Sequence, residues 1–386
     1  MTAAKCYDVI VIGLGAMGGA ACWRLAQRGC RVLGLDQFTP PHTLGSSHGR
    51  SRIIRTAYYE HPAYVPLVQR AFEGWYELEQ LTGRHLLTAC PCLSLGPADG
   101  PMMDSLQQSI RYHQLHAEVL SSDEIRRRYP PWQLPEHYQG ILENQAGILA
   151  VEDCIWAQLT AARTAGADVH TDEPVHHWHA NGSGYIVRTA LQTYSAPFVV
   201  ITAGAWATRL LAHWRLPLKV MRQVMLWFDV GPRRRDFRRD RFPIFIAETP
   251  TGDFYGLPAL DSLGLKVAQH YGAPELADPD AVCRQTTPED AVPVRHFVDQ
   301  FLPGLGAVSH MQVCLYTVSP DRHFVVDRLA SPSASASPVV IAAGFSGHGF
   351  KFAPVIGEIL ADLTLNGTTA WNIHLFRAER FNSPCG

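Results

Sequence analysis

The chain has 386 residues and a formal net charge of −2, and 47% of its residues are hydrophobic while 18% are charged. These values predict a globular protein with a large core and about two domains. They argue against a general nucleic-acid binder, which would be more basic. No stretch approaches the ~20 apolar residues of a membrane helix. The N-terminus has no signal-peptide pattern, so we expect a cytoplasmic protein without a membrane segment.

The nine cysteines are dispersed along the chain. They form neither a CxxC pair nor a cysteine–histidine group with zinc-like spacing. Their odd number, without an export signal, predicts reduced thiols that pack as small hydrophobic side chains. No metal site is therefore expected.

The first predicted unit is a strand, a glycine turn, a helix and a second strand. Residues 7–12 are apolar and mostly β-branched, as in a buried parallel strand. The motif GLGAMG (13–18) follows at once, residues 19–28 have helical spacing, and the apolar residues 31–35 lead to Asp36. This order and spacing predict a dinucleotide-binding unit.

Each residue type in this unit has a physical role. Gly13 permits the tight turn, Gly15 lets the backbone approach a pyrophosphate, and Gly18 lets the helix pack closely against the strand. The phosphates are expected to face the free N–H groups at the helix N-terminus. Asp36 can accept hydrogen bonds from the ribose hydroxyls and disfavours a 2′-phosphate, which argues against NADP. The motif alone leaves FAD and NAD as alternatives.

The rest of the chain predicts further pieces of this unit and a second domain between them. Residues 208–320 are richer in aromatic residues, prolines and polar alternation, which favours a mixed or antiparallel sheet. Residues 331–338 predict a surface loop. The other expected elements are helices at 64–81, 121–128, 150–165 and 354–363, and strands at 167–171, 185–188, 198–206 and 339–344.

Three further segments identify a family. They are GSSHGRSRIIR (45–55), CLYTVSPD (314–321) and GFSGHGFKF (344–352). Together with the N-terminal motif they resemble the monomeric sarcosine oxidase family, which includes N-methyltryptophan oxidase and pipecolate oxidases, within the glycine/D-amino-acid oxidase group. The resemblance runs from about residue 7 to residue 358.

The resemblance implies a fold and a cofactor. The fold is α/β (α+β), with a Rossmann-like FAD-binding domain from residues 1–85, 146–207 and 321–386. Residues 86–145 and 208–320 are expected to form a substrate domain on a mixed, largely antiparallel sheet. FAD is expected to be covalently bound through an 8α-S-cysteinyl thioether from Cys314. The other positions implied at the cofactor lie in the N-terminal unit, a flavin-facing loop and a glycine-rich turn: Gly13, Gly15, Gly18, Asp36, Ser47, His48, Arg52, Gly344, Gly347, Gly349 and Lys351.

The resemblance also implies a substrate site. Arg55 and Lys351 match a clamp for the substrate carboxylate, in which a planar guanidinium and a point charge cooperate. Lys266 matches a lysine that activates dioxygen, since a fixed cation stabilises developing superoxide. Lysine is rare in this chain, which makes its presence at positions 266 and 351 notable. Arg52 is implied beside the flavin ring, where positive charge favours the reduced anion; Tyr255 and His270 are implied beside the substrate, and Tyr316 in the same cavity.

One position departs from the family pattern. Arg50 replaces an acid that family members often carry, which changes the charge near the cofactor and leaves Arg52 and Arg55 in place. We expect this change to affect substrate preference more than chemistry. The role of His348, in the glycine-rich turn, stays open.

The expected activity is oxidation of a small secondary amino acid by dioxygen. Sarcosine is the first candidate, giving glycine, formaldehyde and hydrogen peroxide, and the enzyme is expected to act as a monomer. Pipecolate, proline and N-methyltryptophan are the alternative substrates. An NAD-dependent dehydrogenase and a flavin-binding protein without oxidase activity are the alternatives from other classes.

Overall fold

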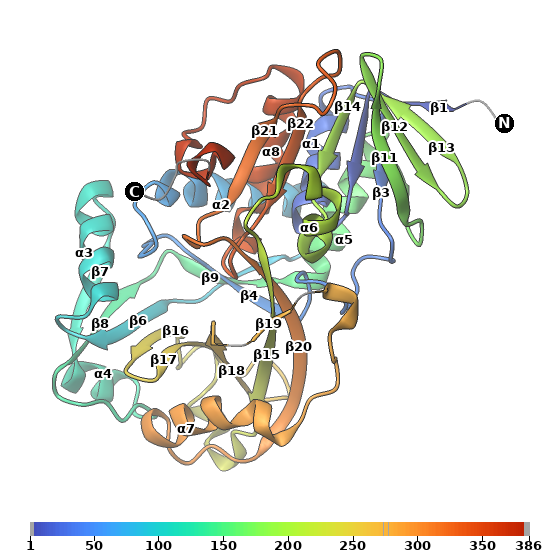
Figure 1. The fold of residues 1–386 in the computed structure, drawn as a ribbon. Helices are drawn as coiled ribbons and strands as arrows, with labels where there is room; N and C mark the ends of the chain where they lie inside the picture. Colours follow the sequence, from blue (N-terminus) through green and yellow to red (C-terminus); the bar gives the residue numbers. More distant parts are fainter. Residues whose placement is uncertain (1–3, 273, 277, 382–386) are drawn as a thin grey trace.

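The computed structural model describes residues 4–272, 274–276 and 278–381. Its first layer is a six-stranded sheet in which five neighbouring strands are parallel and the last, β21, is antiparallel. The strands come from three separate parts of the chain (Figure 1). In sheet order they are β10 (Asp168–His170), β3 (Val32–Leu35), β2 (Val9–Ile12), β14 (Phe198–Ile201), β22 (Val339–Ala343) and β21 (Val325–Leu329).

Both faces of this sheet are covered, which explains why its strands are apolar throughout. Val9 and Val11 of β2 point toward a core formed with helices, while Ile10 and Ile12 point the other way. The helices are α1 (Ala16–Gln27), α2 (Tyr64–Thr82), α5 (Val151–Thr164) and α8 (Ala353–Leu365). The opposite face packs on a small sheet of β1 (Lys5–Cys6), β13 (Thr193–Ala196), β12 (Gly184–Thr189) and β11 (Val175–Asn181).

The second layer is a nine-stranded sheet that is mixed and largely antiparallel, because only β16 and β6 pair in parallel. The predicted fold class is confirmed. Its strands are β19 (Glu275–Leu276), β15 (Lys219–Phe228), β18 (Leu265–His270), β17 (Gly252–Leu257), β16 (Ile244–Thr249), β6 (Cys92–Pro97), β8 (Tyr138–Glu143), β7 (Ala117–Ser121) and β20 (Val308–Val318).

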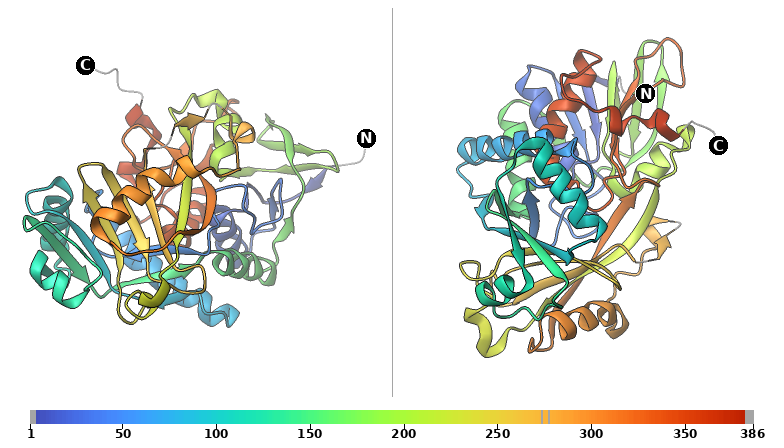
Figure 2. Two further views of the ribbon diagram at one scale, coloured as in Figure 1. Left: turned by 90° about the horizontal axis from the view of Figure 1, so that it is seen from below. Right: turned by 90° about the vertical axis from the view of Figure 1, so that its left-hand side faces the viewer.

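One face of this sheet packs against helix α7 (Val292–Phe301), as Figure 2 shows. Phe297 and Phe301 of α7 pack with Phe228 and Leu265 from the sheet. Because side chains alternate along a strand, the neighbouring residues face the opposite side. The opposite face therefore presents side chains toward the first layer. The shorter helices of this part are α3 (Pro101–His113), α4 (Ser122–Arg128) and α6 (Ala207–Leu210).

A three-stranded sheet connects the two layers. It consists of β4 (Ser51–Arg55), β9 (Ala146–Ala150) and β5 (Leu87–Ala89), all antiparallel. Strand β4 carries two of the arginines predicted for the site. None of the helices in the described part of the chain is long and apolar enough to cross a membrane.

Two predicted elements differ from the structure by three or more residues at one end. Helix α1 begins at Ala16, inside the glycine motif, because Gly13 alone makes the turn with its φ of 95°. The strand predicted over 198–206 ends at Ile201. Gly204 has a φ of 54°, which breaks the extended backbone, and a short 3₁₀ helix follows over Gly204–Trp206.

Candidate active site

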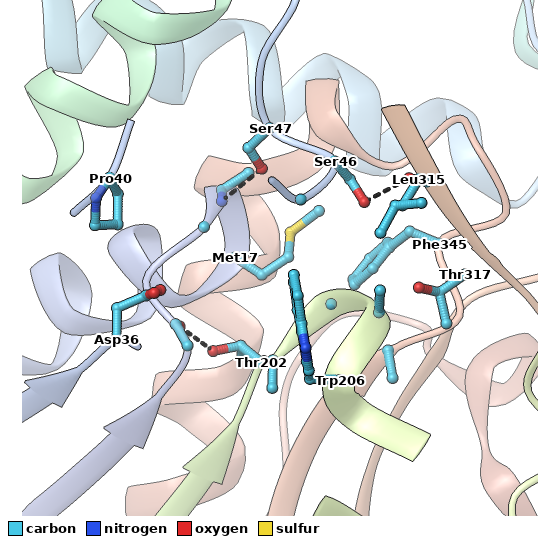
Figure 3. Close-up of a pocket in the computed structure, with 18 of the residues that line it drawn as sticks. Met17, Asp36, Pro40, Ser46, Ser47, Thr202, Trp206, Leu315, Thr317 and Phe345 are labelled. Atoms are coloured by element: carbon cyan, nitrogen blue, oxygen red, sulfur yellow. Dashed lines mark hydrogen bonds between the residues drawn. The ribbon is translucent and has the colours of Figure 1, made fainter. Parts of the chain in front are cut away.

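The larger of two adjoining cavities runs along the carboxyl edge of the six-stranded sheet, where α/β folds bind ligands (Figure 3). Its volume is about 490 Å³. It begins at Asp36 and the glycine turn and extends to Arg52 and Tyr316. We call it the outer cavity.

The glycine turn at the outer cavity is closely packed. A Cβ atom on Gly18 would lie 1.7 Å from the carbonyl oxygen of Gly13, so no side chain fits there. Thr202 Oγ1 donates to the same carbonyl at 2.7 Å. Gly15 is the N-cap of α1 and has no side chain to cap it. The N-cap thus leaves the N–H groups of Met17 and Gly18 in the first turn of α1 without a capping side chain, which is the arrangement that a bound phosphate needs.

Asp36 lies at the end of β3 and lines the outer cavity. Its carboxylate accepts hydrogen bonds from the backbone N–H groups of Leu14 at 2.6 Å and Phe38 at 2.9 Å. These bonds fix the carboxylate beside the glycine turn. Burial raises its pKa despite them. A ribose hydroxyl is a suitable donor for the remaining lone pairs.

The flavin-facing loop predicted from residues 45–55 is tied to both layers. Ser47 Oγ accepts from the N–H of Ala16 at 3.2 Å, and Ser46 Oγ donates to the carbonyl of Leu315 on β20 at 2.6 Å (Figure 3). His48 is fully buried, with Nε2 3.2 Å from the carbonyl of Gly45. Its Nδ1 has no partner among the described residues. Burial lowers its pKa to about 3, so the ring is neutral.

Arg52 lines both cavities, and no carboxylate pairs with it among the described residues. Its guanidinium donates instead to the carbonyls of Ser51 and Ser46, each at 3.0 Å. It also lies 3.8 Å from Sγ of Cys314. A permanently charged group that is satisfied only by neutral oxygens leaves the end of the outer cavity positive.

One face of the nine-stranded sheet presents five of the predicted residues toward this region. On β20, Cys314 and Tyr316 are two positions apart and share a cluster with Met225 and Trp227 of β15. On β18, Lys266 pairs with Trp227 in the register. The period of two along each strand also brings Tyr255 and His270 to this face.

Lys266 is buried below this face and anchors the flavin-facing loop. Its Nζ donates to the carbonyls of Gly49 at 2.7 Å and Ser51 at 3.0 Å, and lies 3.4 Å from Ser51 Oγ. Burial and the nearby Arg52 lower its pKa well below the ordinary value. Neither Lys266 nor Cys314 is among the described residues that line the two cavities. Cys314 lies against Arg52, and Lys266 bonds the same Ser51 carbonyl that Arg52 bonds.

The inner cavity is much smaller, at about 70 Å³. It shares four lining residues with the outer cavity, so the two cavities adjoin there. They are Arg52, Tyr316, Gly347 and Phe350. A Cβ on Gly347 would lie 2.3 Å from the Tyr316 ring, and one on Gly349 would lie 2.4 Å from Phe345. The glycines of the 344–349 turn thus allow the tight approach at this junction, and Gly344, with a φ of 61°, begins the turn.

Arg55 lines the inner cavity and has an acidic partner that the sequence analysis missed. Its Nη2 is 2.7 Å from Oε2 of Glu60, and Nη1 donates to the carbonyl of Ala57. The guanidinium also lies 4.3 Å from the ring centroid of Tyr58 and 4.6 Å from that of Tyr59. Burial alone raises the pKa of Glu60, but Arg55 outweighs it and sets that pKa at about 2.

Lys351 also lines the inner cavity, and its Nζ lies 5.3 Å from the ring centroid of Tyr58, the ring that Arg55 contacts as well. Its Nζ donates to the carbonyl of His348 at 2.8 Å and to the hydroxyl of Tyr58 at 3.2 Å. Burial and the charge of Arg55 lower its pKa to about 7. A carboxylate bound beside Lys351 would favour the charged ammonium.

Two aromatic residues and a histidine complete the inner cavity. His270 Nδ1 lies 3.2 Å from the hydroxyl of Tyr316, and Tyr255 lies at right angles to the His270 ring, 6.3 Å between centroids. Burial lowers the pKa of His270 to about 3, so it is uncharged at neutral pH. The structure therefore brings Arg52, Arg55 and Lys351 together with these three residues.

Glu60 and Tyr58 are the clearest residues that the sequence analysis did not select. Both follow Arg55 within five positions, and an acid so close to a proposed carboxylate-binding arginine was the available signal. Glu143 was equally unexpected. Its Oε2 accepts from the N–H groups of Thr56 at 2.7 Å and Ala57 at 2.9 Å, and so fixes the segment that follows Arg55.

Comparisons with known proteins agree with this arrangement. The profile of a family described as "FAD dependent oxidoreductase" matches residues 8–363. A monomeric sarcosine oxidase from Streptomyces avermitilis is 41% identical, over 97% of each chain. An N-methyl-L-tryptophan oxidase from Salmonella agona is 36% identical, over 97% of this chain and 99% of that protein. The chain therefore belongs to the FAD-dependent oxidoreductase family, in the group that holds these two kinds of enzyme.

Solved structures show the same fold. NikD, described as an unusual amino acid oxidase essential for nikkomycin biosynthesis, is 25% identical over 97% of each chain, with a TM-score of 0.85. Glycine oxidase from Geobacillus kaustophilus has a TM-score of 0.79 at 20% identity, over 99% of this chain and the whole of that one, which supports the fold alone. The residues of this chain fit FAD, because the outer cavity combines an open helix N-terminus, a carboxylate at the ribose position and a cation at its far end.

Replacing Glu60 by Gln should strengthen the binding of a simple carboxylate to the inner cavity. The change removes the only acid from the described lining, so the positive charge of Arg55 is no longer balanced by a carboxylate. We expect the dissociation constant of propionate to fall by roughly fivefold to tenfold, as expected for one charge removed near a partly buried site. The change in flavin absorbance on titration measures it. Glu77→Gln is the control, because Glu77 forms a 2.7 Å ion pair with Arg24 outside both cavities. Weaker propionate binding by Glu60→Gln would contradict this view.

Proposed function

We propose that this protein is a flavoprotein oxidase that oxidises the C–N bond of a small secondary amino acid, with sarcosine as the expected substrate. The products are then glycine, formaldehyde and hydrogen peroxide. One observation supports this most directly. A cavity that fits FAD joins, through Arg52 and Tyr316, a small cavity lined by cations. The relatives named monomeric sarcosine oxidase support the same substrate.

The cations suit an amino-acid carboxylate. Arg55 can offer its planar guanidinium and Lys351 a point charge, since both line the inner cavity. Two anchoring contacts fix the orientation of a small molecule and place one C–H bond toward the junction of the two cavities. Such positioning contributes a large part of the rate in reactions of this kind.

The same charges favour the reactive form of the amine. The nitrogen must be unprotonated, since its lone pair drives loss of hydride from carbon. Nearby cations disfavour a second positive charge, so Arg52 and Lys351 should lower the pKa of the bound amine. His270 is neutral and adds no positive charge. Its Nδ1 lies 3.2 Å from the hydroxyl of Tyr316, and this contact holds both polar groups in place in the cavity wall.

Bound FAD supplies a hydride acceptor and, once reduced, an electron donor for dioxygen. Arg52 would stabilise negative charge at the end of the outer cavity. Water hydrolyses the imine that remains of the substrate. Lys266 is proposed to stabilise developing superoxide, a role that needs the ammonium. The two carbonyls that accept from its Nζ favour this form, whereas burial and Arg52 lower its pKa.

The volume of the inner cavity favours sarcosine over the alternatives. At about 70 Å³ and lined by Tyr59, Ile246 and Phe254 among others, it suits a small molecule better than N-methyltryptophan. Pipecolate and proline lie between these extremes and stay the second candidates. An NAD-dependent dehydrogenase is disfavoured, because the family match spans nearly the whole chain.

Three further statements belong to this proposal. Residues 1–85, 146–207 and 321–386 form the FAD-binding domain, and residues 86–145 and 208–320 the substrate domain; the six-stranded sheet draws its strands from the first set and the nine-stranded sheet from the second. The enzyme acts as a monomer, which the names of the relatives support. It acts in the cytoplasm.

Peroxide release from a panel of substrates tests the activity. Purified holoenzyme should oxidise sarcosine with a higher kcat/KM than pipecolate, proline or N-methyltryptophan. Replacing Arg55 by Met should raise KM for sarcosine by roughly a hundredfold, because a charged, buried hydrogen-bond partner is lost. Arg31→Met is the control, since Arg31 is exposed and pairs with Asp8. A preference for N-methyltryptophan would move the assignment to that substrate, and no peroxide with any of them would refute the oxidase.

Replacing Lys266 by Met should separate the two half-reactions. Reoxidation of the reduced enzyme by dioxygen should slow by roughly a hundredfold or more, the usual effect of removing one preorganised charge. Reduction by the amino acid should change far less. Stopped-flow absorbance measures both rates. Lys219→Met, at an exposed lysine paired with Glu275, should leave both unchanged. Unaltered reoxidation in Lys266→Met would remove the proposed role.

Cys314 is proposed to carry the flavin covalently. The thiol is fully buried, which raises its pKa, and the positive charge of Arg52 opposes this effect and favours the thiolate that a thioether link needs. The yellow colour of the wild-type protein should therefore stay in the pellet after acid precipitation. Cys314→Ala should release its flavin, whereas Cys154→Ala, at a buried core thiol, should retain it. Release from the wild-type protein would contradict a covalent link.

A further inference from the structure

A chain of three hydrogen bonds runs through the wall of the inner cavity and ends at Lys351. His348 Nε2 lies 3.1 Å from the backbone carbonyl of Arg322, and His348 Nδ1 lies 2.9 Å from the hydroxyl of Tyr58. The Tyr58 oxygen lies 3.2 Å from Nζ of Lys351. Tyr58 is fully buried, and His348 and Lys351 are each 6% exposed. The functional assignment so far uses only Lys351.

The chemistry of these groups fixes the direction of every bond. A backbone carbonyl can only accept, so His348 Nε2 must carry the hydrogen that faces Arg322. Burial lowers the pKa of His348 to about 4, so the ring is neutral and its Nδ1 is an acceptor. The hydroxyl hydrogen of Tyr58 then points to Nδ1 at 2.9 Å, which needs a donor and is nearer than the other acceptor within reach, the His348 carbonyl at 3.4 Å. The Tyr58 oxygen therefore presents only lone pairs to Lys351.

Lys351 has a second fixed acceptor. Its Nζ donates to the carbonyl of His348 at 2.8 Å, in addition to the Tyr58 oxygen. Two of its hydrogens are thus held by groups that cannot rotate away. No further acceptor for Nζ is found in the part of the chain that the structure describes, and Lys351 lines the inner cavity. The remaining N–H is therefore available to a ligand there.

We propose that Tyr58 and His348 are positioning residues that fix Lys351 so that its remaining N–H meets the substrate carboxylate. The inference rests on the proposed function of the inner cavity as the site of an anionic amino acid. Neither residue needs to touch the substrate for this. Without the Tyr58 oxygen, the ammonium has one fixed acceptor and can rotate about its terminal bonds, so the carboxylate must order it on binding.

Other groups around Lys351 do not provide this direction. Arg55 and Arg52 repel its charge, while Glu60 attracts it. Glu60 is already paired with Arg55. Only the Tyr58 oxygen and the His348 carbonyl accept from Nζ in the described structure.

The structure offers a closely matched control for Tyr58. Tyr64 is also fully buried, stacks on Tyr58 with 4.9 Å between ring centroids, and places its hydroxyl 3.2 Å from Nδ1 of a histidine, His323. Its hydroxyl makes no bond to Lys351. Replacing either tyrosine by Phe keeps the ring that packs in the core and removes one hydroxyl. A difference between the two variants therefore reports on the bond to Lys351.

The test uses holoenzyme and propionate, which has a carboxylate and no amine, with flavin absorbance as the readout. Tyr58→Phe should weaken propionate binding by roughly tenfold, the range for a lost hydrogen bond to a charged group. It should raise KM for sarcosine by a similar factor and change kcat by less than about twofold, as for a loss of ground-state anchoring. Tyr64→Phe should match the wild type in both measurements.

A double-mutant cycle with Lys351→Met shows whether Tyr58 acts through the lysine. In the Lys351→Met background, Tyr58→Phe should have no further effect on propionate binding. An equal loss in both backgrounds, an equal loss in Tyr64→Phe, or no loss in Tyr58→Phe would each overturn the proposal.

The same measurements separate this inference from the proposed function. If wild-type holoenzyme binds propionate but releases no peroxide with any secondary amino acid, the oxidase assignment fails whatever the cycle shows. If the wild type oxidises sarcosine and the cycle is additive, only the positioning role fails.

Discussion

Buried positive charge is the constraint on which this structure depends. Arg52, Arg55, Lys266 and Lys351 lie in or directly behind the two cavities, and Glu60 is the only acid in the described lining of the inner one. An unpaired buried cation is costly, and here it is stabilised by backbone carbonyls. Bound anions would neutralise these positive charges. A flavin that becomes negative on reduction and a substrate carboxylate are anions of the required kind.

The fold brings these charges together where a mostly parallel sheet meets a largely antiparallel one. The parallel sheet ends in a glycine turn whose helix N-terminus favours phosphate. Helix α7 covers one face of the nine-stranded sheet, and Lys266, His270 and Tyr316 lie on the other face. Strand β4 runs between them and carries Arg52 and Arg55 three positions apart. The cation that contacts both cavities therefore belongs to the element that connects the layers.

Residues that need not touch the substrate fix the direction of the side chains that line the inner cavity. Glu143 fixes the backbone after Arg55 through two N–H groups, and the Tyr58–His348 pair fixes Lys351. Tyr58 follows Arg55 by three positions, whereas Glu143 lies far from Arg55 in the chain. They allow a small cavity to hold two cations in defined directions without bringing further charge into contact with the substrate.

The sequence by itself determined the residue types and their local geometry. The glycine motif and Asp36 predicted the dinucleotide unit, because the turn, the helix N-terminus and the ribose carboxylate are set by contacts within about thirty residues. The segments at 45–55, 314–321 and 344–352 indicated the family, and hence a shared place for Arg52, Arg55, Cys314 and Lys351. The strand order of the second sheet could not be read in the same way, since β6 pairs with β16 across some 150 residues of sequence.

Only the tertiary structure decided which groups face one another. The sequence does not show that Arg55 pairs with Glu60 and not with water. It also does not show that the carbonyl of Arg322 fixes the tautomer of His348. The direction of a hydrogen bond depends on distances of a few tenths of an ångström between segments that are remote in the chain. The cavity volume and the charge state of Lys351 depend on the same packing, because burial and neighbouring charges, and not residue type, set both.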